Sequence, residues 1–251
     1  MAIEPAVLLI ADIGGYTRFM QITRANLAHS QVIIAELLEA IIDAASPMLE
    51  LAKLEGDAAF FYYPLKKGMP SPEQVEQLIA RMRDAFRMKL NQRAVDKACS
   101  CEGCMKVTDL TLKFVAHSGD VAFQKVKSYT ELAGVDVIIV HRMLKNDVPL
   151  REYVLMTEPL VPAAPPSLKT MLQPLIHDFE GIGETKTFYS DLAALPHAPP
   201  MPKRRGFVMR WLHHLVFLFQ TAPYELGLKR PAEHFTDSPR LPAGTAQQQA
   251  S

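Results

Sequence analysis

The N-terminal part of the chain has a continuous apolar run followed by apolar residues at helical spacing. Residues 6–11 form a continuous apolar run that ends at Asp12 and meets Gly14-Gly15, a pattern typical of a buried strand stopped by a turn. From Thr17 to Ala45 the apolar residues recur at spacings of three and four, and Pro47 ends the run. The pattern predicts a strand, a turn and a long helix.

A hairpin and a second helix are predicted next. Two apolar stretches, 48–54 and 57–63, flank a turn at Glu55-Gly56, where the glycine supplies backbone freedom. Ser71-Pro72-Glu73 is a helix-start signature, and the pattern continues amphipathically to Leu90. The sequence thus predicts a strand pair followed by a helix over 71–90.

The following part of the pattern completes one domain. The expected strands are 110–116 and 121–126, joined by a tight turn at 117–120, then 152–157 and a closing hairpin over 176–192. Residues 135–145 hold β-branched side chains that favour a strand by propensity, but the spacing after Gly134 favours a helix. The order fits an α+β domain over 5–192, a ferredoxin-like antiparallel sheet with flanking helices on one face.

The C-terminal part is predicted to lie outside this domain. A proline-rich and then basic linker is expected over 193–205, an amphipathic helix over 206–220 and a polar tail over 236–251. Because residues 203–219 are flanked by basic side chains, they suit peripheral contact with an anionic membrane or a partner's groove. The alternative, which we favour, is that this helix docks on its own domain or across a dimer.

Composition narrows the class of protein. Of 251 residues 49% are hydrophobic, and 27 basic residues balance 27 acidic ones, so nothing global predicts nucleic acid as a partner. We expect no signal peptide and no spanning segment, since no apolar run reaches the roughly 20 residues that a membrane helix needs. Three cysteines, an odd number, argue against a secreted disulfide scaffold. A cytoplasmic protein is expected.

Two aspartates carry the candidate chemistry. Asp12 ends a buried strand just before the glycines, and Asp57 opens the second strand of the predicted hairpin. If those strands are neighbours, both carboxylates can hold magnesium or manganese, ions that neutralise phosphates and activate a nucleophile. Free backbone N–H groups of residues 14–17 can then face phosphate oxygens. The structural alternative is that Asp12 caps its helix and Asp57 is a turn residue.

Five segments of the chain resemble segments of the class III adenylate and guanylate cyclases. They are Leu9–Phe19, Lys53–Ala58, Phe114–Val121, Gly134 with Arg142 eight positions later, and Phe179–Phe188. Their order is that of the family. The cysteine loop, with Leu112–His117 and Val140–Lys145, also resembles a bacterial branch of this superfamily known as a domain of unknown function.

The resemblance implies a metal and phosphate site. Asp12, Asp57 and the backbone of Ile13 would bind Mg²⁺ or Mn²⁺. The phosphates would lie against the turn formed by Gly14, Gly15, Tyr16 and Thr17.

The resemblance also implies residues that read the nucleotide. Lys53 and Glu131 match the purine-reading positions, which leans towards ATP, and Arg142 matches the arginine that stabilises the transition state. Cyclases of this class are head-to-tail dimers with metal aspartates from one protomer and the arginine from the other. A homodimer with composite sites is therefore implied.

Two positions depart from the active enzymes. Ile138 stands where the family has an asparagine that orients the ribose, and its side chain has neither donor nor acceptor. Glu180 aligns with the lysine that contacts the terminal phosphates, so its charge would repel them, and Lys186 is the alternative candidate for that contact. Each loss could cost on the order of 10²-fold in rate.

All the cysteines lie within six positions. Cys99, Cys101 and Cys104 can bind one soft metal such as zinc, with His117 as a candidate fourth ligand. The alternatives are reduced thiols in a loop, or a redox sensor. For His117 a structural hydrogen bond is the other interpretation, and His141 is an ordinary helix residue or one that faces a partner subunit.

Three functions stay open at this point. The first is a cyclase-homology protein that binds a purine nucleoside triphosphate, ATP favoured, and divalent metal, in a regulatory role with weak or no cyclase activity. The second is an active adenylate cyclase that forms cyclic AMP and pyrophosphate. The third is a scaffold that binds metal through its cysteines and uses the fold for protein contacts without nucleotide.

Overall fold

The structure is a computed structural model that describes residues 2–23, 27–96, 105–127 and 129–195, together with residues 202, 203, 206, 211 and 215. The predicted cysteine site (Cys99, Cys101 and Cys104) lies outside the described residues. So do the predicted polar tail and most of the predicted linker and C-terminal helix.

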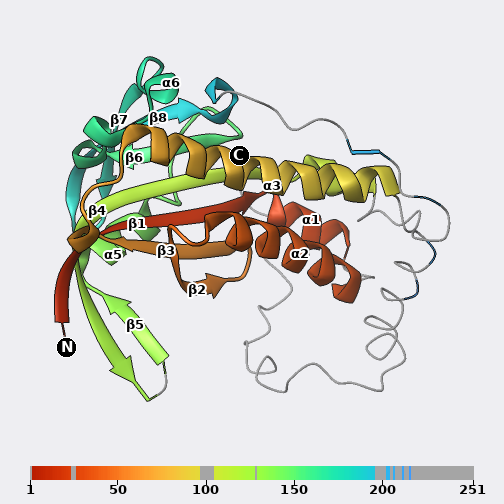
Figure 1. Ribbon diagram of the computed structural model, residues 1–251, viewed down its shortest axis with the longest axis horizontal. Coiled ribbons are helices and arrows are strands. Elements are labelled where there is room, and N and C mark those ends of the chain that lie inside the picture. Colours follow the sequence, from red (N-terminus) through yellow and green to blue (C-terminus); the bar gives the residue numbers. More distant parts are fainter. Residues whose placement is uncertain are drawn as a thin grey trace, which may run out of the picture.

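One mostly antiparallel sheet organises the fold (Figure 1). Its strands are β1 (Ala2–Gly14), β2 (Glu50–Glu55), β3 (Ala58–Pro64), β4 (Thr111–Val126), β5 (Tyr129–Ala133), β6 (Tyr153–Thr157), β7 (Gln173–Phe179) and β8 (Gly183–Asp191). The order is β2-β3-β1-β4-β6-β8-β7, with β5 paired to β4, and only β4 and β6 run parallel. The predicted α+β class is confirmed.

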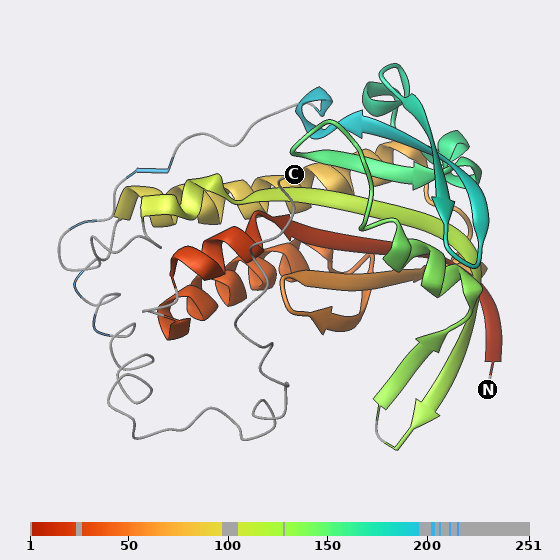
Figure 2. The same ribbon diagram turned by 180° about the vertical axis from the view of Figure 1, so that it is seen from behind.

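Helices cover both faces of this sheet (Figures 1 and 2). The α-helices are α1 (Tyr16–Ile22), α2 (Leu27–Ala45), α3 (Pro72–Asp96), α5 (Val135–Arg142) and α6 (Pro166–Lys169). Short 3₁₀ turns are η2 (Leu65–Lys67), η3 (Val107–Asp109), η4 (Glu158–Ala163) and η5 (Leu192–Ala194). Helices α2 and α3 pack together on one face, and α5 lies on the other.

The two faces bury two separate cores, so the prediction of helices on one face is wrong. Along β1, Leu9 and Ile13 face the core of α2 and α3, whereas Leu8 and Ile10 face the core under α5. Successive side chains of a strand point to opposite faces, so a strand covered on both sides reads as an unbroken apolar run. This is why residues 6–11 show no alternation.

Strand β4 is longer than expected. It runs without interruption over 16 residues, so the predicted turn at 117–120 is wrong. The polar residues there remain in the ladder, because His117 pairs with Leu8, and Gly119 pairs with Ala6 of β1. Strand β5, which returns along the end of β4, was not predicted. The helix predicted over 17–45 comprises two helices, α1 and α2.

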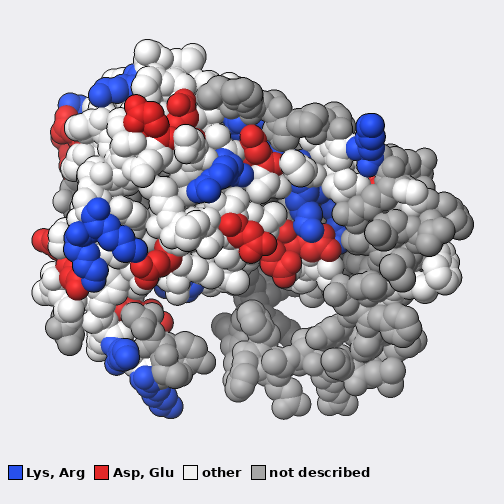
Figure 3. All heavy atoms as spheres, in the orientation of Figure 1, with Lys and Arg blue, Asp and Glu red and all other residues white. Residues whose placement is uncertain are grey.

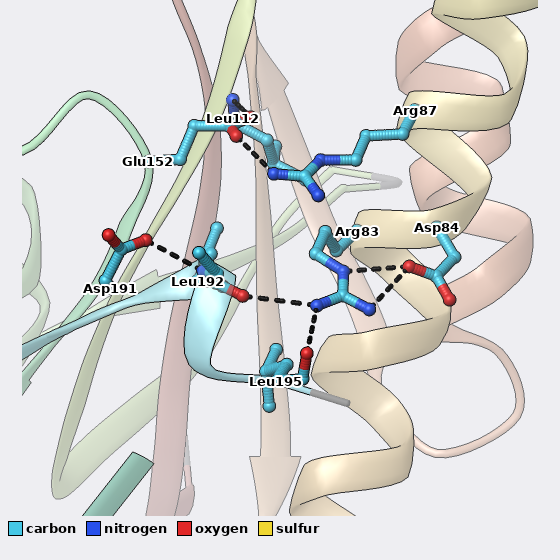
Figure 4. Close-up of polar contacts among 9 residues, drawn as sticks. Arg83, Asp84, Arg87, Leu112, Glu152, Asp191, Leu192 and Leu195 are labelled. Carbon is cyan, nitrogen blue, oxygen red and sulfur yellow. Dashed lines mark hydrogen bonds and ion pairs between the residues drawn. The ribbon is translucent and has the colours of Figure 1, made fainter. Parts of the chain in front are cut away.

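A buried arginine closes the domain after β8 (Figure 4). The guanidinium of Arg83, on α3, is 1% exposed and donates to the carbonyls of Leu192 and Leu195 at 3.1 and 3.0 Å. It also pairs with Asp84 at 2.8 Å. Leu192 and Leu195 are themselves buried. The chain therefore packs against α3 as far as Leu195.

The helical face carries charges of both signs. Basic and acidic side chains lie next to one another there (Figure 3). Arg93 and Lys89 of α3 both form ion pairs with Glu36 of α2. Within the described residues no helix combines the length and the hydropathy needed to cross a membrane.

Candidate functional site

The two aspartates of the sequence analysis lie on neighbouring strands. Asp12 of β1 pairs with Ala58 of β3, the residue directly after Asp57. The amide of Ile13 donates to the carbonyl of Asp57 at 3.1 Å, which ties the hairpin turn to the end of β1. The spatial expectation that β1 and the hairpin meet at these carboxylates agrees with this register.

The electrostatics of the pair depart from those of exposed carboxylates. Burial, and after it the charge of Asp12, raises the pKa of Asp57 from 3.8 to about 6. Asp12 is 13% exposed, and its carboxylate accepts the Lys113 ammonium of β4 at 2.7 Å. Burial acts against the charged lysine, but the contact with Asp12 raises the pKa of Lys113. The Lys113 ammonium therefore attracts both Asp12 and Asp57, whose carboxylates repel each other.

Lys113 is the functional candidate that the sequence analysis missed. It sits directly opposite Asp12 in the β1–β4 register, between the buried residues Leu112 and Phe114. A lone lysine in an apolar strand is normally read as the solvent-facing position of an alternating pattern. The pairing register would have identified it, since antiparallel partners on one face interact directly.

The glycine turn connects β1 with α1 beside the aspartates. Gly15 has a φ of 85°, in the left-handed region that favours glycine, and it precedes α1. A Cβ on Gly14 would lie 2.3 Å from the Thr111 hydroxyl, so β1 and β4 approach closely there. Tyr16 begins the seven-residue α1 and is half-buried, and Thr17 is exposed.

A second group of predicted residues lines an open cleft of about 720 Å³ between β2, α5 and the β7–β8 turn. Lys53, Ile138, Arg142 and Glu180 all belong to it. Arg142 faces Glu180 at 3.8 Å, and Lys53 pairs with Glu55 at 2.9 Å. The side chain of Ile138 is 50% exposed. We call this the α5 cleft.

Two histidines are held by hydrogen bonds. His117 is buried, with Nδ1 at 2.9 Å from the Thr157 hydroxyl and Nε2 at 2.8 Å from the Asp136 carboxylate. Both of its nitrogens are engaged, which agrees with the structural interpretation. His141 Nε2 lies 2.9 Å from Glu55, so this histidine joins α5 to β2.

Two other predicted residues lie apart from the α5 cleft. Glu131 is exposed on β5, opposite Gln124. The Lys186 ammonium pairs with Glu158 at 2.6 Å and lies over the ring of Phe188. Neither residue is among those that line the α5 cleft.

Beside the aspartates opens a cavity of about 530 Å³, which we call the basic cavity. Its lining includes Gly14, Gly15, Tyr153 and Asn146. The basic members are Arg18, Lys106, Lys113 and Arg151, and the acidic member is Asp109. The excess of positive charge suits an anion.

The donor set at Asp12 and Asp57 suits magnesium or manganese. Two carboxylates and the carbonyl oxygen of Ile13 would supply hard oxygen ligands, and Mg²⁺ is commonly held by one or two carboxylates plus phosphates. Among the residues that the structure describes, no group of three or more His, Cys, Asp or Glu side chains could hold a metal. The raised pKa of Asp57 favours a cation that relieves the repulsion. The residues fit an ion that arrives with phosphate.

The fold is that of adenylyl and guanylyl cyclase catalytic domains. The catalytic core of a rhodopsin-guanylyl cyclase with converted specificity, in complex with ATPαS, matches with a TM-score of 0.52 and 16% identity over 74% of this chain and 95% of that one. The guanylyl cyclase Cya2 matches with a TM-score of 0.54 and 13% identity, over 75% of this chain and 92% of that one. A bacterial light-regulated adenylyl cyclase matches with a TM-score of 0.56 and 13% identity, over 88% of this chain and 58% of that one. Such identities establish the fold alone.

Sequence comparison identifies the family. Residues 34–153 match the family described as a protein of unknown function, DUF2652. The chain is also 46% identical over 202 residues to the uncharacterized protein Rv2561/Rv2562 of Mycobacterium tuberculosis (strain ATCC 25618 / H37Rv), which covers 80% of this chain and 93% of that protein. With this identity and coverage, the chain belongs to the same protein family as Rv2561/Rv2562.

Proposed function

We propose that this protein binds a purine nucleoside triphosphate, ATP favoured, together with Mg²⁺ or Mn²⁺, and that it serves a regulatory role with weak or no cyclase activity. The observation that carries the proposal is the register that joins Asp12, Asp57 and Lys113 at one end of the sheet. One of its fold neighbours was solved with ATPαS.

The nucleotide is held at composite sites in a head-to-tail homodimer. Asp12 and Asp57 lie at the β1 end, whereas Lys53 and Arg142 belong to the α5 cleft, and neither aspartate lines that cleft. A second copy supplies the complementary half, since two-fold symmetry brings one face of each protomer onto the other. Exposed apolar side chains on β2 and α5, Leu54 and Val135 among them, suit burial in that interface.

Within such a site each side chain has a distinct task. The two carboxylates hold the cation, which when bound neutralises phosphate charge and lowers the pKa of a nearby hydroxyl. Lys53 contacts the base, and Arg142 donates to phosphate oxygens as charge develops on them. The glycine turn lets the backbone of residues 14–17 approach the phosphates.

Weak or absent turnover is expected from two residues of the α5 cleft. Ile138 lines it with a half-exposed apolar side chain that offers the ribose no hydrogen bond. The Glu180 carboxylate lies 3.8 Å from the Arg142 guanidinium, so it competes with a phosphate for the positive charge of Arg142. Losing one stabilising donor costs on the order of 10²-fold in rate.

Binding is tested by calorimetric titration with a non-hydrolysable ATP analogue and Mn²⁺. Wild-type protein is expected to bind, and Asp57→Ala is expected to lose the dependence of binding on the metal. Arg81→Gln, an exposed position on α3 that lines neither the α5 cleft nor the basic cavity, serves as a charge control. Wild-type protein that takes up neither the analogue nor the metal would leave the proposal without support.

Turnover is tested separately with ATP and Mn²⁺, by quantifying cyclic AMP. We expect a rate at or near background. A product rate that Asp57→Ala abolishes would instead establish the active adenylate cyclase. The third hypothesis, a cysteine-metal scaffold, concerns residues outside the described part of the chain, and metal analysis of wild type against Cys101→Ser decides it.

A further inference from the structure

We propose that the basic cavity binds the terminal phosphates of the nucleotide, with Arg18 and Arg151 as the residues that distinguish a triphosphate from a monophosphate. This inference rests on the proposed function, because the base and the metal would lie where that function puts them. The terminal phosphates would then lie in the aspartate half of the site, because Glu180 makes the α5 cleft unfavourable for them.

The basic cavity begins where the aspartates are. Lys113 lines it and also contacts Asp12 at 2.7 Å, so a phosphate chain that leaves the aspartates meets this ammonium first. The wall also holds two polar side chains that bond to each other, Tyr153 and Asn146. Tyr153 is 5% exposed, and its hydroxyl exchanges hydrogen bonds with the Asn146 amide at 2.8 and 3.0 Å. The wall is thus held in one geometry before any ligand arrives.

The two arginines keep their charge available. Among the described residues Arg18 has no hydrogen-bond or ion-pair partner, and it is exposed on α1. Arg151 donates one bond, at 2.9 Å, to the carbonyl of Asp109, and no acidic side chain of the described residues pairs with its charge. A guanidinium fork matches two oxygens of a phosphate, and such bonds are stronger than neutral ones. Both side chains are therefore free to bind phosphate.

The charge balance of the two halves differs. In the α5 cleft the basic side chains Lys53, Arg142 and Lys145 are matched by Glu55, Asp178 and Glu180. The basic cavity is lined by four basic side chains and one acid, Asp109, which lies 4.0 Å from Lys106. Lys113 pairs with Asp12 outside the lining, so Arg18 and Arg151 supply the excess of positive charge. Terminal phosphates carry most of the charge of a triphosphate, so they favour the cavity.

The experiment uses inorganic tripolyphosphate with Mn²⁺ as the probe, beside a non-hydrolysable ATP analogue and AMP. The variants are Arg18→Gln and Arg151→Gln, and the matched control is Arg81→Gln, an exposed arginine of α3. Each variant is expected to weaken binding of tripolyphosphate and of the ATP analogue about tenfold, the equivalent of one charge-assisted hydrogen bond. AMP binding and the control are expected to stay at wild-type values.

The outcomes separate this inference from the proposed function. If both variants bind tripolyphosphate as tightly as wild type while wild type binds the ATP analogue, the cavity inference is overturned and the proposed function stands. If wild type binds tripolyphosphate through the arginines but not the ATP analogue, the cavity binds polyphosphate that is not part of a nucleotide, and both the proposed function and the inference built on it are overturned. Wild-type protein that binds neither probe overturns both.

Discussion

Opposing effects act on the ionisation of Asp57 at the end of the sheet. Burial and the neighbouring Asp12 favour its neutral form, while the Lys113 ammonium favours the charged one, and the balance leaves its pKa near 6. At neutral pH the folded protein therefore holds an ionised group that it disfavours. In the proposed function, this unfavourable charge is the reason that the pair would favour a divalent cation.

This imbalance predicts a pH-dependent stability. The pKa of Asp57 in the folded protein is raised above its ordinary value of 3.8. The stabilisation that its neutral carboxyl gives the folded state is therefore fully present below pH 3.8 and is lost as pH rises through about 6. Asp57→Asn is expected to stabilise the metal-free protein by about 1 kcal/mol near pH 7.5, after allowance for solvent screening, and to have no such benefit near pH 3.5. Urea unfolding at both pH values measures the difference. An equal effect at both would contradict the assigned cause.

The same residues show what a sequence reveals at this scale. Asp12 and Asp57 could be identified because each lies within two residues of a glycine at an expected strand end, where carboxylates are chemically conspicuous. Lys113 could not, because its importance comes from its partner across the β1–β4 ladder rather than from its neighbours in sequence. Pairing register is a property of two strands, and neither strand encodes it alone.

At the scale of elements, the hydrophobic period predicted helix α5 correctly although propensity opposed it. Val137, Val140 and Met143 are buried at a spacing of three, so packing on the sheet outweighs the cost of β-branched residues in a helix. Strand β4 shows the opposite case. Its polar residues 117–120 read as a turn, but β1 supplies the backbone partners, and Thr157 and Asp136 satisfy the ring of His117.

The contact between α3 and η5 gives a prediction about an element boundary. Replacing Arg83 with methionine keeps much of the buried volume but removes the donors to two carbonyls and leaves Asp84 without its partner. We expect a loss of about 3 kcal/mol in the free energy of unfolding, the scale for breaking a buried charge contact.

Urea unfolding of Arg83→Met against wild type measures this loss. Arg81→Gln, on the same helix but exposed, is the matched control and should unfold as wild type does. Equal stabilities for the Arg83 and Arg81 variants would mean that the contacts of the Arg83 guanidinium add nothing to the stability of the domain.

At the scale of the whole molecule, the two halves of the candidate site border different cavities of one chain. One end of β1 and the hairpin turn hold the acids and Lys113, while the α5 cleft holds Lys53 and Arg142. The resemblance of short segments was enough to predict the fold, because the segments follow its strand and helix order. It leaves activity as a prediction, because the expected loss of turnover rests on two single side chains, Ile138 and Glu180.

A mixing experiment tests whether two copies complete one site. Asp57→Ala damages the acid half and Arg142→Ala damages the α5 half, so neither homodimer of the proposed head-to-tail assembly holds an intact site. In a heterodimer of the two variants, one site combines both undamaged halves and the other combines both damaged ones. Unfolding and refolding an equimolar mixture is therefore expected to restore about a quarter of the wild-type number of sites, since random pairing makes half the dimers mixed.

Titration with the ATP analogue and Mn²⁺ counts the restored sites, and each variant refolded alone provides the baseline. A site built within one chain contains both halves in every protomer, so mixing two damaged chains cannot restore it. Binding in the mixture that equals the mean of the separate variants would therefore exclude the composite site. Restored binding would instead require that Lys53 and Arg142 of one copy meet Asp12 and Asp57 of another, since the α5 cleft contains neither aspartate of its own chain.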